Sequence, residues 1–427
     1  MRRRLLFLLA MLLLLTTVSP SAGQKPLSQP QMAAFYDKAC QYWALKLRGA
    51  PADRLEAVLA EVKAYDAFSW KDLRSEFLKP FRGPRLKDRK GQQKLTRPPA
   101  GLEDCYYIVQ GDRGRSRTRP LVVCLHGGSR GIGDPGQIMG LLGNTYLGKK
   151  CIVAAPKVPA EAVFAEPISA RLVREMIWEI GMEYAVDFDR IYCTGHSLGG
   201  VGAWYMAGVM PDLFAAAAPA AGNPPAIVDY EYLYNTPLYV VHGATDIQVT
   251  PDADRQAAEI IKNLPKENKR EGWFVYREIL TKDGRGHALP NDVVRDMAEF
   301  MLRFRRSYAP DRVICACPLT RGRDLEIEPN ARCFWLVIEG SPWGSKADGR
   351  IEKDNTLRIT FTGAGRLIVY LSDDMVDLDR PVKIWVNGQL KVDRVVPRSA
   401  QFLLEHIDQT RDRGRTFANQ VVVAGDM

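Results

Sequence analysis

The chain has 427 residues, of which 46% are hydrophobic and 26% charged, with a formal net charge of +9 at pH 7. This is the composition of a globular protein and excludes a mainly disordered or collagen-like chain. The length exceeds that of one ordinary domain, so two or three folded units are expected. Three of the positive charges lie within the first four residues, and the overall charge identifies neither nucleic acid nor any other partner.

The N-terminus has the three parts of a secretory signal peptide. Three arginines precede an apolar, leucine-rich run over residues 5–15, and Ser21, Ala22 and Gly23 provide small residues for cleavage. We therefore expect residues 1–23 to be removed and the mature protein to be secreted or periplasmic. The alternative is an uncleaved anchor, but the run is shorter than the roughly 20 residues that span a bilayer. Stable membrane insertion after cleavage is not expected.

Residues 24–104 are predicted to form a helical extension followed by a basic linker. The helical stretches cover residues 31–47 and 54–65, and the linker covers residues 80–99. Positive charges concentrate between Lys79 and Arg97, which would suit an anionic polymer or membrane surface. A solvated linker is the simpler interpretation, because Phe81 is the one aromatic residue there that could stack on a base. No nucleic-acid partner is predicted.

Residues 105–308 alternate short apolar runs with longer amphipathic stretches, which is typical of a mostly parallel α/β sheet flanked by helices. The predicted strands are residues 105–109, 121–125, 151–155, 190–194, 214–218, 238–241 and 274–280. The predicted helices are residues 169–184, 198–210, 251–263 and 291–305. The strands are continuously apolar, which indicates burial on both faces.

Residues 309–427 are predicted to form a small C-terminal antiparallel β domain, arranged as a sandwich. The predicted strands are residues 334–338, 357–362, 367–371, 382–386, 390–395 and 420–424, with one helix near residues 400–408. Asn387-Gly388 is a strong signal for a two-residue hairpin turn.

Eight cysteines in an exported chain permit disulfides, but their spacing is scattered. Cys124 and Cys193 fall in predicted core strands and are expected to be buried thiols. One bridge is expected among Cys315, Cys317 and Cys333, with its pairing left open. No histidine accompanies these cysteines at the spacing of a zinc site, and no metal or nucleotide motif occurs, so no cofactor is predicted.

Ser197 is the predicted nucleophile, in the segment Gly195-His196-Ser197-Leu198-Gly199. A Gly-x-Ser-x-Gly match alone arises by chance in roughly one chain in seven of this length. Here it directly follows a predicted strand and directly precedes a predicted helix, which is the context that the motif requires.

A nucleophilic serine needs a histidine base and a carboxylate that orients the base, in the chain order serine, acid, histidine. His287 follows the serine within the glycine-rich segment 284–288, whereas His406 lies in the β domain. We assign His287 as the base. Asp246 follows the predicted strand 238–241 and is assigned as the acid. The rival acids are Asp252, Asp254 and Asp283.

The oxyanion of acyl transfer requires preorganised N–H donors. The backbone N–H of Leu198 and that of Gly127 or Gly128 are predicted to supply them. The two glycines belong to the segment His126-Gly127-Gly128, which ends a predicted central strand.

Four motifs occur in the order found in α/β-hydrolases: His126 to Gly128, Gly195 to Gly200, His242 to Asp246, and Gly286-His287. Over residues 105–306 the chain resembles exported esterases related to polyhydroxybutyrate depolymerases, feruloyl esterases and dienelactone hydrolases. It resembles the catalytic domain of prolyl oligopeptidases less closely. Dienelactone hydrolases carry a cysteine nucleophile, and prolyl oligopeptidases are preceded by a large propeller; this chain has Ser197 and a short N-terminal segment. The resemblance therefore implies a serine carboxylic ester hydrolase.

Two other functions stay open from the sequence. The same residues would serve a serine peptidase that acts on short peptides. Alternatively, the hydrolase could be silent and the β domain could bind glycan or a surface polymer. The expected substrate is a small-molecule or polymeric ester. Arg130 and Arg285 lie near the assigned residues and would suit an acidic substrate group, although solvated loop arginines are the simpler interpretation. The oligomeric state is not predicted.

Overall fold

The structure is a computed structural model. It describes residues 24–83, 91–112, 116–128, 132–158, 162–268, 271–281, 284, 286–317, 331–340 and 344–424. The predicted signal peptide, part of the predicted basic linker, Asp283, Arg130 and Arg285 lie outside these residues. Within the described part of the chain, every helix is too short or too polar to cross a membrane.

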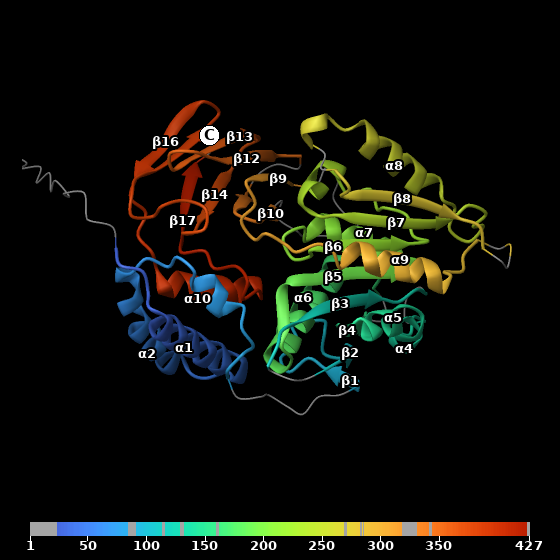
Figure 1. The fold of residues 1–427 in the computed structure, drawn as a ribbon, viewed down its shortest axis with the longest axis horizontal. Coiled ribbons are helices and arrows are strands. Elements are labelled where there is room, and N and C mark those ends of the chain that lie inside the picture. Colours follow the sequence, from blue (N-terminus) through green and yellow to red (C-terminus); the bar gives the residue numbers. More distant parts are fainter. Residues whose placement is uncertain are drawn as a thin grey trace, which may run out of the picture.

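The centre of the molecule is an eight-stranded sheet in the order β1-β2-β4-β3-β5-β6-β7-β8 (Figure 1). Its strands are β1 (Gly91–Lys94), β2 (Tyr106–Gln110), β3 (Arg119–Leu125), β4 (Ile152–Lys157), β5 (Val186–His196), β6 (Ala216–Ala220), β7 (Leu238–Gly243) and β8 (Phe274–Ile279). Strand β2 runs antiparallel to β1 and β4, whereas all pairs from β4 to β8 are parallel. The order reverses at β4-β3-β5, so ligands are expected at the carboxyl ends of the central strands. The fold is that of the α/β-hydrolases.

Helices cover both faces of this sheet. On one face lie α6 (Pro167–Glu183), α7 (Leu198–Val209) and α8 (Asp252–Asn263), and on the other lie α4 (Pro135–Ile138), η2 (Met139–Gly143), α5 (Asn144–Gly148) and α9 (Asn291–Met301). Alternate residues of β3 separate the two cores: Leu121 and Val123 face the first group, and Val122 and Cys124 face the second. Short 3₁₀ turns η3 (Tyr230–Asn235) and η4 (Lys266–Asn268) lie in the connections.

All seven strands and all four helices predicted between residues 105 and 308 are present, with ends shifted by a few residues. Two features were missed. Strand β1 lies inside the predicted linker, because its sequence Gly-Gln-Gln-Lys has no apolar pattern and only its pairing with β2 makes it a strand. The short helices over residues 135–148 were also not predicted.

The C-terminal region forms two sheets, in the orders β10-β11-β14-β17 and β16-β15-β13-β12-β9. Their strands are β9 (Arg312–Ala316), β10 (Ala331–Cys333), β11 (Leu336–Glu339), β12 (Lys346–Glu352), β13 (Thr356–Thr362), β14 (Arg366–Leu371), β15 (Val382–Val386), β16 (Gln389–Arg394) and β17 (Asn419–Ala424), with helix α10 (Ala400–Thr410). Apolar residues of both sheets share one core, as expected for a sandwich.

Some details of this region differ from the prediction. The purely antiparallel arrangement is wrong, because β13 and β15 pair in parallel. Strands β9, β10 and β12 were missed. The hairpin prediction is confirmed: Asn387 (φ 50°) and Gly388 (φ 78°) join β15 to β16, with the two positive φ angles that such a turn needs.

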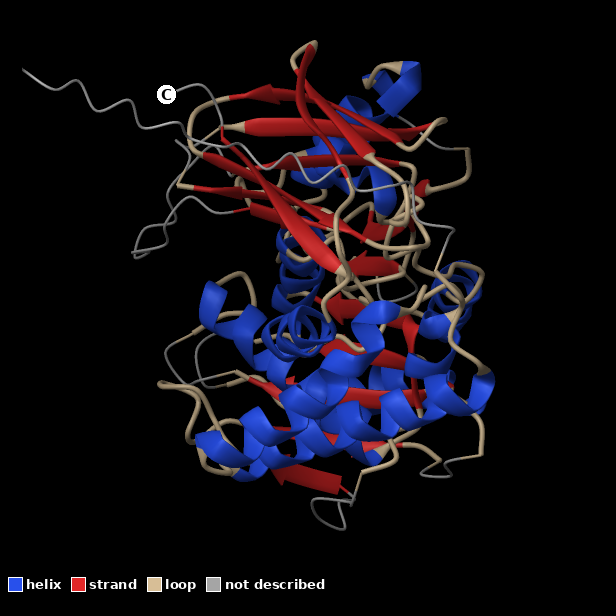
Figure 2. Cartoon of the chain, turned by 90° about the vertical axis from the view of Figure 1, so that its left-hand side faces the viewer, coloured by secondary structure: helices blue, strands red, loops and turns tan. Residues whose placement is uncertain are grey.

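The N-terminal helices share the core of the C-terminal sheets. These are α1 (Gln29–Arg48), α2 (Ala52–Val62), η1 (Lys63–Ala67) and α3 (Leu73–Phe77). Trp43 and Phe77 belong to the same buried cluster as Leu404, and the Trp43 indole donates a hydrogen bond to the Leu404 carbonyl at 3.3 Å. In Figure 1 these helices lie beside α10, and Figure 2 shows this side of the molecule, with helices below the upper group of strands. The predicted N-terminal extension and the predicted C-terminal domain therefore share one core. The sequence did not predict this, because an amphipathic sequence reveals an apolar face but not the surface that packs against it.

The expected disulfide is absent. All eight cysteines lie in the described residues, and all are buried free thiols. This agrees with the prediction for Cys124 and Cys193 and corrects the one for Cys315, Cys317 and Cys333.

The shared core predicts the effect of Trp43→Ala. Trp43 is fully buried and packs edge-on against Phe77 and Trp178, so its loss should lower the free energy of unfolding by about 3–5 kcal/mol. Urea denaturation followed by far-UV circular dichroism measures this. Trp385→Ala on the half-buried outer face of β15 is the control and should cost about 1 kcal/mol or less. Equal losses in both variants would contradict a core shared by the two ends of the chain.

Candidate active site

Ser197 occupies a sharp turn between β5 and α7, which is the predicted strand, turn and helix context. Its backbone has φ 60° and ψ −125°, a conformation that non-glycine residues rarely adopt. Such a residue costs on the order of 1–3 kcal/mol and persists only where its surroundings impose it. The strain therefore points to Ser197 as a functional position.

Close packing imposes this conformation. A Cβ atom at Gly199 would lie 2.0 Å from the Leu125 carbonyl oxygen of β3, so only glycine lets the start of α7 approach the central strand. The Ser197 carbonyl accepts hydrogen bonds from the backbone N–H groups of Gly200 and Val201 at 2.8 and 3.1 Å. The Ser197 N–H donates to the Ala220 carbonyl at 3.0 Å. Both sides of the turn are thus fixed to neighbouring strands or to the helix.

His287 and Asp246 are in direct contact. The Nδ1–H group of His287 donates to Asp246 Oδ2 at 2.6 Å, which joins the loops that follow β7 and β8. The second oxygen, Oδ1, accepts from the backbone N–H groups of Gln248 and Val249 at 2.9 and 3.1 Å. Burial alone would raise the pKa of Asp246, but these hydrogen bonds outweigh it and lower that pKa. The carboxylate is therefore ionised at neutral pH.

This contact sets the tautomer of His287. With the Nδ1 proton directed at a carboxylate, Nε2 is left free to accept a proton. The His287 side chain is 14% exposed, whereas that of Asp246 is completely covered. In the described residues the Ser197 hydroxyl forms no hydrogen bond with His287; catalytic contacts of this kind are often long without substrate.

His196 holds the backbone of His287. Its Nε2 lies 2.7 Å from the His287 carbonyl oxygen, and a carbonyl only accepts, so Nε2 carries the proton. Burial lowers the pKa of His196 and favours this neutral form. The centroids of the two rings lie 4.8 Å apart, which places the base beside the residue that precedes Ser197. This role was missed, because His196 stands at an unconstrained position of the five-residue motif.

The predicted oxyanion loop lies against the nucleophile. A Cβ atom at Gly127 would come within 3.1 Å of Ser197 Cβ and 3.7 Å of Ser197 Oγ. Leu198 is the first residue of α7, where backbone N–H groups have no partner within the helix. Gly128 follows Gly127 with φ 84°, and the next three residues of this loop lie outside the described part of the chain. The positions of Leu198 and Gly127 suit oxyanion binding, which stays a prediction.

The rival acids in the described chain have other partners. Asp254 Oδ2 lies 2.7 Å from Nδ1 of His242, and Asp254 Oδ1 accepts from the Trp204 indole at 3.0 Å. Asp252 is exposed and pairs with Arg255 at 3.0 Å. The rival base His406 is buried in the C-terminal body against Tyr370. Asp246 is thus the acid that contacts His287.

The buried pair of His242 and Asp254 lies directly behind Asp246. His242 Nε2 is 2.8 Å from the Val249 carbonyl and 3.5 Å from Asp246 Oδ2. Both imidazole nitrogens face acceptors, so the pair holds a second proton and is neutral overall. Burial opposes a charge on His242, but the hydrogen bond with Asp254 outweighs it and raises the pKa of His242; burial raises the pKa of Asp254. Asp246 is therefore spared a second negative charge nearby.

No protein-family model and no curated protein sequence matches the chain. Matching solved structures include a thermostable esterase, with 22% sequence identity and a TM-score of 0.42, over 49% of this chain and 62% of the esterase. Another is Thermogutta terrifontis esterase 2 phosphorylated by paraoxon, with 19% identity and a TM-score of 0.40, over 52% of this chain and 97% of that one. The apo form of the same esterase matches with 20% identity and a TM-score of 0.38, over 51% and 96%.

These similarities are too low to add to what the sheet order and the turn at Ser197 establish. The residues that the structure describes contain no cluster of three or more histidine, cysteine or acidic side chains suited to a metal ion.

The neutral pair predicts the effect of Asp254→Asn. Loss of one partner of a buried pair should lower the free energy of unfolding by roughly 3–5 kcal/mol near neutral pH. Because the folded-state pKa of His242 is raised, the pair's contribution is fully present below the ordinary histidine value of about 6.5 and is lost as the pH rises through the folded-state value. Urea titrations between pH 6 and pH 9 measure both effects.

Asp252→Asn is the matched control, since Asp252 begins the same helix but has an exposed side chain. It should change stability by about 0.5 kcal/mol or less and keep the wild-type pH dependence. If Asp254→Asn behaves like this control, the buried pair does not stabilise the fold as described.

Proposed function

We propose that the protein hydrolyses carboxylic esters through an acyl intermediate on Ser197. The observation that carries this proposal is the strained Ser197 at the carboxyl end of β5, next to an aligned His287 and Asp246 pair. These are the parts that nucleophilic serine catalysis requires.

In the first step, Ser197 Oγ attacks the ester carbonyl carbon while His287 Nε2 takes the hydroxyl proton. The imidazolium that forms donates from Nδ1 to Asp246, whose carboxylate is held by two backbone N–H groups and therefore cannot turn away. The tetrahedral oxyanion is stabilised by the N–H groups of Leu198 and of Gly127 or Gly128.

In the second step, the C–O bond to the alcohol breaks and His287 Nε2 donates its proton to the leaving alkoxide. Water then attacks the acyl-Ser197 carbonyl and gives its proton to His287. Collapse of the second tetrahedral intermediate releases the carboxylic acid and returns the proton to Ser197 Oγ. One imidazole thus serves as base and acid in both halves of the cycle.

Esters are favoured over peptides by the sequence. The four motifs resemble those of exported esterases more closely than those of prolyl oligopeptidases. Substrate is proposed to approach over the carboxyl ends of β3, β5, β7 and β8.

Substitution of the catalytic residues tests this proposal. Ser197→Ala should lower kcat for a p-nitrophenyl acyl ester by several orders of magnitude, and Asp246→Asn by about 10⁴-fold, because it favours the wrong tautomer of His287. Asp252→Asn is the control and should leave kcat unchanged. Unaltered turnover in Ser197→Ala would overturn the assignment.

Two further measurements separate the alternatives. Faster cleavage of peptide anilides than of acyl esters by the wild-type enzyme would identify a peptidase. Failure of folded wild-type protein to react at Ser197 with a fluorophosphonate would identify a silent hydrolase with a binding role.

We also propose that the chain is exported and that residues 1–23 are then removed. Expression of the full sequence in a Gram-negative host should yield periplasmic or secreted protein whose N-terminus, read by mass spectrometry, starts near Gln24. Replacement of the three N-terminal arginines by glutamate should retain uncleaved precursor in the cytoplasm. Wild-type protein found in the cytoplasm with residues 1–23 intact would contradict export.

A further inference from the structure

The most exposed large apolar side chains of the described residues lie around the candidate active site. Ile132, Ile247 and Leu280 are 78%, 82% and 79% exposed, whereas the next large apolar side chain, Ile260, is 49% exposed. Ile132 lies in the loop after β3, Ile247 in the loop after β7, and Leu280 directly after β8. A single exposed isoleucine is ordinary, but three such residues at one edge of a sheet indicate a surface that binds an apolar group. We call these three residues the apolar rim.

Ile132 lies beside the loop that contacts the nucleophile. A Cβ atom at Gly128 would come within 3.5 Å of the Ile132 carbonyl carbon. The preceding residue, Gly127, packs against Ser197, since a Cβ atom there would lie 3.1 Å from Ser197 Cβ. The Ile132 backbone is thus part of the packing around the candidate nucleophile.

The other two members of the rim belong to the loops of the acid and the base. Ile247 directly follows Asp246 in the loop after β7. Leu280 precedes Thr281, whose hydroxyl accepts a hydrogen bond at 2.9 Å from the Gly286 N–H in the loop of the base. Each of the three candidate catalytic residues therefore has one member of the rim on its own loop or on a loop packed against it.

The order of the strands places the rim on both sides of the nucleophile. Ser197 follows β5, which lies next to β3 on one side and is followed by β6, β7 and β8 on the other. Neighbouring strands lie about 4.8 Å apart, so the loops of the rim are spread over roughly 14–19 Å. An acetyl or butyryl group is far shorter than this span. An ester that reaches the rim on both sides of Ser197 must therefore carry extended groups on both sides of the ester bond.

The C-terminal sheets contact the opposite edge of the central sheet. Tyr232 in η3, which precedes β7, forms a small apolar cluster with Ile314 of β9. In the same turn the Asn235 side-chain amide donates to the Arg312 carbonyl of β9 at 2.9 Å. In Figure 1 the C-terminal sheets accordingly lie to the left of the central sheet. These contacts leave the carboxyl ends of the strands accessible to a large substrate.

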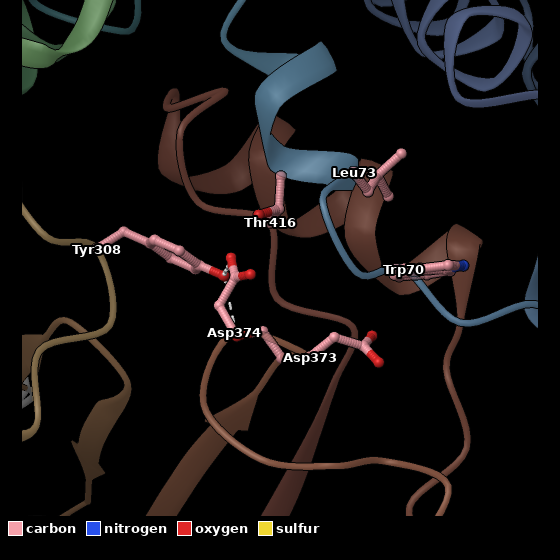
Figure 3. Close-up of a pocket in the computed structure, with 7 residues that line it drawn as sticks. Trp70, Leu73, Tyr308, Asp373, Asp374 and Thr416 are labelled. Carbon is pink, nitrogen blue, oxygen red and sulfur yellow. Dashed lines mark hydrogen bonds between the residues drawn. The ribbon is translucent and has the colours of Figure 1, made fainter. Parts of the chain in front are cut away.

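The small pocket drawn in Figure 3 offers an ester no alternative site. Its volume of about 10 Å³ accommodates one water-sized particle. The Tyr308 hydroxyl donates to Asp374 at 2.6 Å, and Asp373 forms an ion pair with Arg398. Polar groups that satisfy one another in so small a space leave no room for an apolar group.

We propose that the apolar rim binds the acyl and alcohol groups of the substrate, and that the site takes esters with extended apolar groups on both sides of the ester bond. This inference rests on the proposed function. Ile132 contacts the group on one side of Ser197, and Ile247 and Leu280 contact the group on the other. Burial of apolar surface against the rim supplies binding free energy that a short, water-soluble ester lacks.

Two series of esters test this proposal on the wild-type protein. The acyl series is p-nitrophenyl acetate, butyrate and octanoate, and the alcohol series is ethyl, butyl and octyl acetate, all below the concentration at which the esters aggregate. In each series kcat/KM should rise roughly tenfold from the four-carbon to the eight-carbon group, because the added methylenes are partly buried on the rim. A flat or falling profile in either series would overturn the proposal.

Variants of the rim show whether these residues cause the preference. Ile132→Ser should flatten the profile of one series, and Ile247→Ser combined with Leu280→Ser that of the other. Both variants should hydrolyse ethyl acetate within about twofold of the wild type, which separates loss of the rim from damage to the catalytic loops. Ile260→Ser, in the last turn of α8, makes the same change at an exposed isoleucine outside the rim and is the control. Rim variants that keep the profiles of Ile260→Ser would contradict the assignment.

Two further outcomes separate this inference from its alternatives. If a second copy of the chain covered the rim, the wild type would sediment as a dimer and the triple rim variant as a monomer, and that result would overturn the proposal. Equal sedimentation coefficients are expected. Turnover of ethyl acetate with flat profiles would leave the proposed function standing and remove the substrate class alone, whereas a wild type inactive on every ester would remove both.

Discussion

The candidate active site depends on one constraint, the close approach of α7 to the central strands. Gly199 sits so near the Leu125 carbonyl that any side chain would push the helix away, and the turn before it must therefore close within a single residue. Ser197 takes a positive φ as a result. The energetic cost of this strain is small compared with the free energy gained by burying the surrounding sheet. The turn places the Ser197 hydroxyl at the carboxyl ends of the strands, where the loops after β7 and β8 converge. The position of Ser197 is thus a property of the core.

Asp246 is held by a chain of buried polar contacts that starts on α7. Trp204 of α7 bonds to Asp254 of α8, which bonds to His242 at the end of β7, which in turn contacts the Val249 carbonyl. Val249 donates to Asp246. One network therefore connects the helix after Ser197 with the acid loop. The neutrality of the His242 and Asp254 pair matters for the proposed mechanism. A second negative charge a few ångströms from Asp246 would stabilise the imidazolium form of His287 in the free protein as well as in the transition state.

The sequence predicts those parts of the fold whose residues carry their own signal. Strands β3, β4, β6 and β7 are largely apolar runs, and the candidate residues Ser197, Asp246 and His287 follow from motif order. Strand β1 carries no such signal, since it is a strand only through its pairing with β2. The pairing of His242 with Asp254 also depends on tertiary contact between β7 and α8. The single core shared by the chain ends was beyond prediction for the same reason: burial of Trp43 against α10 joins residues 361 positions apart.

Buried arginines, among them Arg306 and Arg415, lie at the boundary between the central sheet and the C-terminal sheets. Apolar surfaces could join the bodies with less desolvation, and buried ion pairs contribute little net stability compared with well-packed apolar residues. What the pairs supply is a defined docking geometry, since Arg306 must meet Asp412, and Arg415 must meet Asp212, across the boundary. Any other docking geometry would leave a buried charge without a partner.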